Sequence, residues 1–227
     1  MILAAHQPCY LPNLTFFYKM CQADVFILAD DLKYTTHNLI NRTKIKTARG
    51  VHWLSVPVRT KGRLKQLIHA VQIDTAQNWQ HKHWKSLLVN YKYAAYFDKY
   101  ADFFENLYTK SWCNLLQLNL EIIVYILKCL NISTKILFSS ELNLQGKGSQ
   151  RLINLLEKLE CDTYITEAAY RSYLSPELFR DYGFKLNFFS YHYSIYHQQF
   201  GDFVAGLSIA DLLFNEGELS YHIILGK

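Results

Sequence analysis

The chain has 227 residues, of which half are hydrophobic, with 17 Tyr and 14 Phe but only 4 Pro and 9 Gly. This composition favours one domain with a substantial core and excludes long linkers. The net charge of +5 at pH 7 suits an anionic ligand such as a nucleotide or nucleotide-sugar and is too small to demonstrate nucleic-acid binding. No signal-peptide pattern and no bilayer-spanning apolar segment is present, so we expect a cytoplasmic protein.

The first strand and the loop after it are the predicted active site. Residues 1–5 form an apolar run, which is typical of a strand buried on both faces. A loop with two prolines follows, and a helix is expected from Leu14 to Gln22. His6, Gln7 and Tyr10 would then lie at the carboxyl end of a central strand, beside a helix N-terminus. Open α/β sheets bind ligands there, and the helix end favours anions.

A second buried strand, residues 24–29, ends at Asp30 and Asp31. Two carboxylates at the end of a strand can hold a metal ion, a ribose hydroxyl or an amine, although Asp31 can equally do no more than shape the turn. We treat Asp31 as a catalytic candidate.

Residues 33–50 are polar and basic, and the pattern predicts either a solvated loop or a flap over a phosphate. Asn41, Arg42 and Lys44 are its candidate ligand-binding residues, because Arg binds phosphate bidentately and Lys supplies a point charge. Strands are expected at 51–58 and near 68–73.

A helical insertion is predicted at about 78–131, with later helices at 96–108 and 112–130. In its first helix, Trp84, Leu87, Leu88 and Tyr91 have the spacing of a buried face. His81 and His83 do not share a helix face, so we predict no zinc site. His83 is a candidate acid or base, and an ordinary surface histidine is the alternative.

The strand pattern resumes at 135–138 and ends at Ser139 and Ser140, two further candidate ligand-binding residues. Lys147 lies between two glycines and could bring backbone amides to an anion, although the Walker A spacing is absent. Ser149 is the expected cap of a helix at 150–159. A strand at 162–166, a helix at 175–181 and a strand at 185–189 complete a parallel, right-handed unit. In the tail, Ser208 and Gly217 are expected to begin and end a short helix.

Motifs along nearly the whole chain resemble the WbqC-like family of bacterial polysaccharide-cluster proteins. They are His6-Gln-Pro-x-Tyr-Leu-Pro12, Phe17-Tyr-Lys19, Ala23-Asp-Val-Phe26, Asp31, Asn41-Arg42-x-Lys44-Ile-Lys46, Trp53-Leu-x-Val-Pro57, Lys82-His-Trp-Lys85, Asn90-Tyr91, Ser139-Ser-Glu-Leu142, Asp162-Thr-Tyr-Ile165 and Leu207-Ser-Ile-x-Asp-Leu-Leu-Phe-Asn215. One departure is Thr166-Glu167-Ala168, where we expect a glycine-containing turn, so that Glu167 would intrude on the site.

The resemblance implies a place in O-antigen gene clusters, near enzymes that make amino sugars. The start of the chain also resembles the histidine-bearing loop of nucleotidylyltransferases, which implies that His6 contacts an α-phosphate; the second histidine of that pattern is missing, and Tyr10 occupies its neighbourhood. The expected fold is a single α/β domain over residues 1–227, with a doubly wound, mainly parallel sheet resembling nucleotidylyltransferase-like folds and the helical insertion.

We therefore expect an enzyme of surface-glycan biosynthesis that forms an amide on the amino group of a nucleotide-linked amino sugar. His6, Arg42, Lys44 and Lys147 would bind phosphate, and His83 or Asp31 would accept the proton of the amine. The alternative is a non-catalytic protein that binds the nucleotide-sugar.

The cofactor is not determined by the sequence. ATP with Mg²⁺ is required if the protein activates a carboxylate, with Asp30 or Asp31 as the metal ligand. A thioester or an aminoacyl-tRNA donor requires no metal. A third hypothesis is RNA binding through residues 33–65, which predicts a steep salt dependence of affinity. The abundant aromatic residues are compatible with a homodimer.

Overall fold

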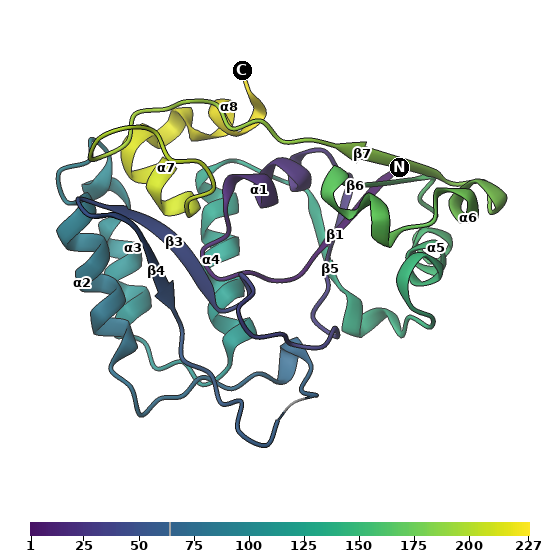
Figure 1. The fold of residues 1–227 in the computed structure, drawn as a ribbon, viewed down its shortest axis with the longest axis horizontal. Coiled ribbons are helices and arrows are strands. Elements are labelled where there is room, and N and C mark those ends of the chain that lie inside the picture. The colour runs from purple at the N-terminus through teal and green to yellow at the C-terminus, as the bar shows by residue number, and fades with distance from the viewer. Residues whose placement is uncertain (64) are drawn as a thin grey trace. The chain divides into compact units, whose positions relative to one another are not determined.

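A computed structural model describes residues 1–63 and 65–227 (Figure 1). The chain divides into two compact units. The sheet unit comprises Met1–Gln7, Thr15–Asp31 and Ile132–His192, and the helical unit comprises Pro8–Leu14, Leu32–Asn131 and Tyr193–Lys227. The chain therefore passes from the first unit to the second between Gln7 and Pro8 and returns before Thr15.

The sheet unit is built on five parallel strands in the order β5-β2-β1-β6-β7. The strand bounds are β1 Ile2–His6, β2 Val25–Leu28, β5 Lys135–Phe138, β6 Thr163–Glu167 and β7 Lys185–Phe189. The helices of this part of the chain are α1 Leu14–Cys21, α5 Gly148–Lys158 and α6 Pro176–Asp181, with 3-10 turns at Ser139–Leu142 and Ala168–Tyr173. The predicted α/β class and doubly wound, parallel sheet are confirmed.

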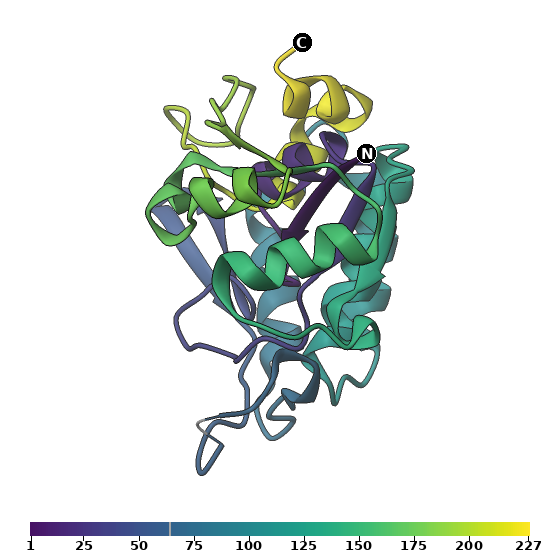
Figure 2. The same cartoon turned by 90° about the vertical axis from the view of Figure 1, so that its right-hand side faces the viewer.

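The two faces of the sheet are covered by different helices. Leu3, Val25 and Ile27 pack in one core with Ile153 of α5 and Phe179 of α6; α5 lies beside the strands in Figure 1 and across them in Figure 2. Because successive side chains of a strand alternate between the faces, Phe26 points to the other side. Its ring lies 5.3 Å from that of Phe16 of α1. Both faces of the central strands are therefore buried, which explains their unbroken apolar sequences.

The strand order reverses beside β1. From β1 the chain leads to β2 and β5 on one side, and α5 then carries it across to β6 and β7 on the other side. The carboxyl ends of β1 and β6 therefore flank the switch point, where ligands of open α/β sheets bind.

The helical unit contains an antiparallel hairpin and most of the helices. The hairpin strands are β3 Arg42–Thr47 and β4 Gly50–Ser55. The helices are α2 Trp79–Tyr91, α3 Phe97–Thr109, α4 Leu115–Cys129, α7 Ile209–Glu216 and α8 Ser220–Leu225, with 3-10 turns at Ile68–Ala70 and Gly217–Leu219.

Three sequence predictions in this unit need correction. Residues 42–47 are a strand rather than a loop, since Thr43 and Ile45 are buried and alternate with charged side chains. The strand predicted at 51–58 spans Gly50–Ser55 and pairs only with β3. The strand predicted near 68–73 is a 3-10 turn at Ile68–Ala70, followed by isolated bridges from Gln72 to Asn114 and from Ile73 to Val58 instead of a ladder.

The predicted buried face of α2 is also partly wrong. Trp79, His83, Leu87 and Tyr91 are buried, whereas Leu88 is 38% exposed. The true stripe repeats every four residues and includes a histidine, which a search for hydrophobic spacing passes over.

The tail forms as expected. Ser208 caps α7 by accepting a hydrogen bond from the backbone N–H of Ala210, and Gly217 ends the helix. Gly217 has φ +54°, and a Cβ at this position would lie 2.4 Å from the ring of Tyr96. A larger residue is therefore excluded by both backbone conformation and space.

All five cysteines carry free thiols. Of the helices formed by residues 1–63 and 65–227, none has the length and apolar character needed to cross a membrane.

Candidate functional site

His6 ends the central strand of the sheet unit. Its Nδ1 lies 2.8 Å from the carbonyl oxygen of Gln7 and donates to it, because a carbonyl can only accept. The imidazole ring lies edge-on to Phe16, with 5.1 Å between centroids. Burial, together with the positive charge of Lys19, lowers the pKa of His6 to about 4. At neutral pH the ring is therefore uncharged, with its proton on Nδ1 and not on Nε2.

Lys19 and Glu167 place opposite charges at the switch point beside His6. Lys19 projects from α1, and its side chain is 2% exposed; Glu167 ends β6, and its side chain is 25% exposed. The ammonium and the carboxylate are 3.8 Å apart, which is longer than a hydrogen bond. The ring centroid of Tyr170 lies 5.7 Å from the ammonium.

Sequence reasoning missed Lys19 as a site residue. The available signal was a lysine in the otherwise largely apolar helix Leu14–Cys21, because a buried lysine needs a partner. The sequence predicts that Glu167 intrudes on the site but does not identify its partner. The register of β6 explains its position: Tyr164 packs in the core beneath α5, so Glu167, three residues later, points to the α1 face.

A second polar cluster lies at the carboxyl ends of β2 and β5. Asp30 accepts hydrogen bonds from the backbone N–H of Ser140 at 2.9 Å, from the Ser140 hydroxyl at 2.7 Å and from the Ser139 hydroxyl at 3.2 Å. Asp31 accepts from the Ser139 hydroxyl and forms an ion pair with Arg151 of α5. The structure thus brings together three predicted site residues, Asp31, Ser139 and Ser140, and adds Asp30 and Arg151 to them.

This cluster does not fit a Mg²⁺ ion. Each carboxylate oxygen of Asp30 and Asp31 already accepts a hydrogen bond or ion pair from the protein, whereas Mg²⁺ requires near-ideal octahedral oxygen ligands. The guanidinium of Arg151 would also repel a cation at Asp31. Within the described part of the chain, no group of three or more His, Cys, Asp or Glu side chains could hold a metal ion.

The loop around Lys147 is arranged differently from the prediction. Lys147, rather than Ser149, occupies the N-cap position of α5, and its side chain is exposed and makes no capping hydrogen bond. The hydroxyl of Ser149 accepts instead from the backbone N–H of Ser175, at 2.9 Å. The prediction of Ser149 as the cap is therefore wrong, because the helix begins two residues earlier than expected, at Gly148.

Tyr10 and His83 meet in the helical unit. The Tyr10 hydroxyl lies 2.8 Å from Nδ1 of His83 and 2.5 Å from the hydroxyl of Tyr108. Burial lowers the pKa of His83 to about 4, although a hydrogen bond to the backbone of Ser55 opposes the shift. His83 is 4% exposed and Tyr10 is fully buried. The alternative of a surface histidine is wrong, and the two residues form the centre of a closed polar network.

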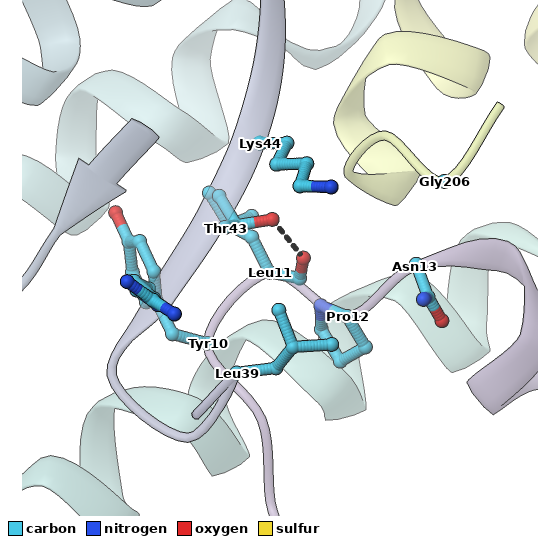
Figure 3. A pocket seen from close by; sticks show the side chains of 9 residues that line it. Tyr10, Leu11, Pro12, Asn13, Leu39, Thr43, Lys44 and Gly206 are labelled. Atoms are coloured by element: carbon cyan, nitrogen blue, oxygen red, sulfur yellow. Dashed lines mark hydrogen bonds between the residues drawn. The ribbon is translucent and has the colours of Figure 1, made fainter. Parts of the chain in front are cut away.

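A cavity of about 10 Å³ lies in the same unit and can hold about one water-sized group. Its lining includes Tyr10, Asn13, Arg42, Thr43, Lys44 and Gly206 (Figure 3). Thr43 donates a 2.9 Å hydrogen bond to the carbonyl oxygen of Leu11, which holds β3 against the loop. Asn41 uses its Nδ2 to donate to the carbonyl oxygen of Val56, at 2.8 Å.

The predicted site residues therefore belong to two groups. His6, Gln7, Asp31, Ser139, Ser140 and Lys147 lie in the sheet unit, and Tyr10, Asn41, Arg42, Lys44 and His83 lie in the helical unit.

Comparison with known proteins gives one family. The sequence model of the WbqC-like protein family matches residues 7–223. The chain belongs to the WbqC-like family. This WbqC-like chain is also 35% identical over 217 residues to the uncharacterized protein Rv1507c of Mycobacterium tuberculosis. The alignment covers 95% of this chain and 94% of that protein. No solved structure matches this chain.

The WbqC-like match covers both groups of residues. Lys19, Glu167 and the cavity-lining residues lie inside the matched range, and His6 directly precedes it. The WbqC-like family is therefore defined over both compact units.

Proposed function

We propose that this WbqC-like protein is an enzyme of bacterial O-antigen biosynthesis that forms an amide on the amino group of a nucleotide-linked amino sugar. The observation that carries the proposal is the Lys19–Glu167 pair beside neutral His6 at the switch point of the sheet. A nucleotide-linked amino sugar carries phosphate charges and an ammonium group, so it presents one partner for each member of the pair.

Lys19 and His6 are the proposed phosphate-binding residues. The buried ammonium of Lys19 supplies a charge that water screens weakly. A bound phosphate would offset the influence of Lys19 on His6 and raise the pKa of the histidine, so that the ring can take up a proton and donate from Nε2. The switch-point position agrees with the general location of ligands in doubly wound sheets.

Glu167 is the proposed proton acceptor. An ammonium must lose a proton before its nitrogen can attack an acyl carbonyl, and the Glu167 carboxylate is accessible enough to receive it. The nitrogen then forms the new C–N bond and loses its second proton, while the acyl bond to the thiol or hydroxyl of a preactivated donor breaks and the leaving group takes up that proton. Glu167 releases the first proton to water. Asp31 is less suited because Ser139 and Arg151 hold its carboxylate, and His83 lies in a closed network in the other unit.

The test is calorimetric titration with a panel of nucleotide-linked amino sugars and their N-acetylated counterparts. We expect the wild-type protein to bind the free amine at least about tenfold more tightly, because a charge-assisted hydrogen bond contributes roughly 1.5–3 kcal/mol. Glu167→Gln should remove the preference and leave the N-acetylated ligand unaffected. Glu157→Gln, an exposed position on α5, is the matched control. A wild-type protein that binds neither form contradicts the proposal.

His6→Asn separates binding from structure, because the asparagine amide can still donate to the Gln7 carbonyl while Nε2 is lost. We expect weaker binding of both sugar forms at an unchanged melting temperature. Turnover is then measured with an acyl thioester, and in parallel with the free acid, ATP and Mg²⁺. Binding without turnover under either condition identifies a non-catalytic nucleotide-sugar protein.

A further inference from the structure

The β3–β4 hairpin of the helical unit presents an aromatic ring and two cations on one face. In its register Lys44 pairs with Trp53 and Arg42 with Ser55, so all four side chains share a face. The other face is buried through Thr43, Ile45 and Leu54. Trp53 is 38% exposed. The Arg42 guanidinium lies 4.2 Å from the centroid of its ring, and the Lys44 ammonium lies 5.1 Å from it.

Arg42 retains unused hydrogen-bonding capacity. Its Nη2 donates to the carbonyl oxygen of His37. Its Nε is buried and has no hydrogen-bond partner among residues 1–63 and 65–227. A buried donor on a cationic group is costly to leave unsatisfied. An oxygen of an anionic ligand would satisfy it.

The cavity lined by Arg42 and Lys44 matches such an oxygen in size. Its volume of about 10 Å³ is enough for one water-sized group. In Figure 3 the Lys44 side chain extends from β3 on the side of the Gly206 loop, with Asn13 beyond Pro12. Arg42 and Lys44 line this cavity, and the same two side chains contact the ring of Trp53.

We infer that this hairpin face is a binding surface for a nucleotide unit, with the base stacked on Trp53 and a phosphate held by Arg42 and Lys44. Base–aromatic stacking and cationic phosphate contacts are the two elements of nucleotide recognition without base specificity. The surface lies wholly in the helical unit, so the inference is independent of the site proposed for the sheet unit. The nucleotide unit belongs either to a free nucleotide or to a single strand of RNA.

The competing explanation is that the cation–π contacts only stabilise the hairpin, as cross-strand pairs do. The two explanations differ in what Trp53→Phe and Trp53→Ala do. A phenylalanine preserves a stacking surface, whereas alanine removes it. A purely structural Trp53 would change the melting temperature and leave ligand affinity unaltered.

The experiment titrates uridine 5′-diphosphate, adenosine 5′-diphosphate and pyrophosphate, and follows tryptophan fluorescence and heat. It is carried out in the Lys19→Met background, which removes the buried cation beside His6. We expect both nucleotides to bind about tenfold more tightly than pyrophosphate, the effect of one stacked base. Trp53→Ala should remove this difference, and Trp53→Phe should keep most of it.

The charge contribution is tested with Lys44→Gln against Arg49→Gln. Both remove one positive charge, but Arg49 is exposed in the turn of the hairpin. We expect Lys44→Gln to weaken nucleotide binding about tenfold and Arg49→Gln to change it less than twofold. Equal effects of the two variants, or affinity unchanged in Trp53→Ala, would overturn the inference.

A ten-residue oligouridylate identifies the source of the nucleotide. If the oligomer binds more than tenfold more tightly than the diphosphate and its affinity falls steeply with salt, the natural ligand is an RNA strand. If the two bind equally, it is a free nucleotide. If neither binds, the surface is structural and the inference fails.

Discussion

The two polar clusters at the carboxyl edge of the sheet differ in how their charges are neutralised. At the ends of β2 and β5, Asp30 and Asp31 are bound by the hydroxyls of Ser139 and Ser140, one backbone N–H and Arg151. At the ends of β1 and β6, Lys19 and Glu167 are 3.8 Å apart.

The position of each cluster in the topology accounts for the difference. Both clusters lie at the ends of hydrogen-bonded parallel neighbours, but β2 and β5 are on the same side of β1, so the chain leaves both strands on one side of the switch point. β1 and β6 flank the switch point, where the connections run to opposite sides of the sheet. Carboxylates after a strand therefore do not by themselves indicate a ligand site. Their role depends on whether the neighbouring strand lies on the same side of the switch point or across it.

The largest expected effect is on stability and concerns the closed cluster. Asp30→Ala should lower the free energy of unfolding by roughly 3 kcal/mol, because the buried Asp30 carboxylate is the acceptor for the backbone N–H and the hydroxyl of Ser140, whereas the Ser139 hydroxyl keeps Asp31 as its acceptor. Urea denaturation measures the change. Asp181→Ala, an exposed position in the same unit, should change it by less than about 0.5 kcal/mol. A similar loss in both variants would show that the hydrogen bonds of Asp30 contribute little.

The next effect is a pH dependence that arises from His6. Its pKa falls from 6.5 in the unfolded chain to about 4 in the folded one, so the neutral ring is favoured by folding. The stability it contributes is complete above pH 6.5 and is lost as the pH falls toward 4, by roughly 2 kcal/mol between pH 7 and 5. Denaturation across this range should show a shallower slope in His6→Asn. An unchanged slope would mean that His6 titrates normally in the folded protein.

The smallest expected effect on stability concerns the switch-point pair. Lys19→Met should change the free energy of unfolding by less than about 1 kcal/mol, since replacing a buried charge with an apolar side chain removes its desolvation cost. The pKa of His6 should rise, because the charge of Lys19 is one cause of its depression. An NMR titration of the imidazole measures this. A loss above 2 kcal/mol would place Lys19 among the groups that hold the fold.

Most of the sheet unit is predictable because local periodicity decides it. The strands at 135–138 and 185–189 and the helix at 14–21 agree with the structure to within a residue or so. The hairpin was missed in part because Arg42–Thr47 carries charges at alternate positions. Such an alternation is the pattern of a half-buried strand, but its polar content is typical of a loop.

The site residues were less predictable than the elements that carry them. The sequence predicts that Asp31 and Ser139 contact a ligand, and the structure adds that the Ser139 hydroxyl donates a hydrogen bond to the Asp31 carboxylate. The sequence identifies His83 as a candidate acid or base and Tyr10 as a residue of the first loop. It contains no local signal that the two are partners, because 73 residues separate them in the chain.

The strands of the sheet unit and its parallel, doubly wound class can be predicted from the chain alone, because apolar runs and 3.6-residue spacing record which faces are buried. Which charges meet depends on the fold. Lys19 and Glu167 become partners because β6 pairs with β1, and His83 becomes neutral because α2 buries it against Tyr10. The physical reason is that propensity acts between neighbours in sequence, whereas electrostatic partners and desolvation depend on which distant segments the fold brings into contact.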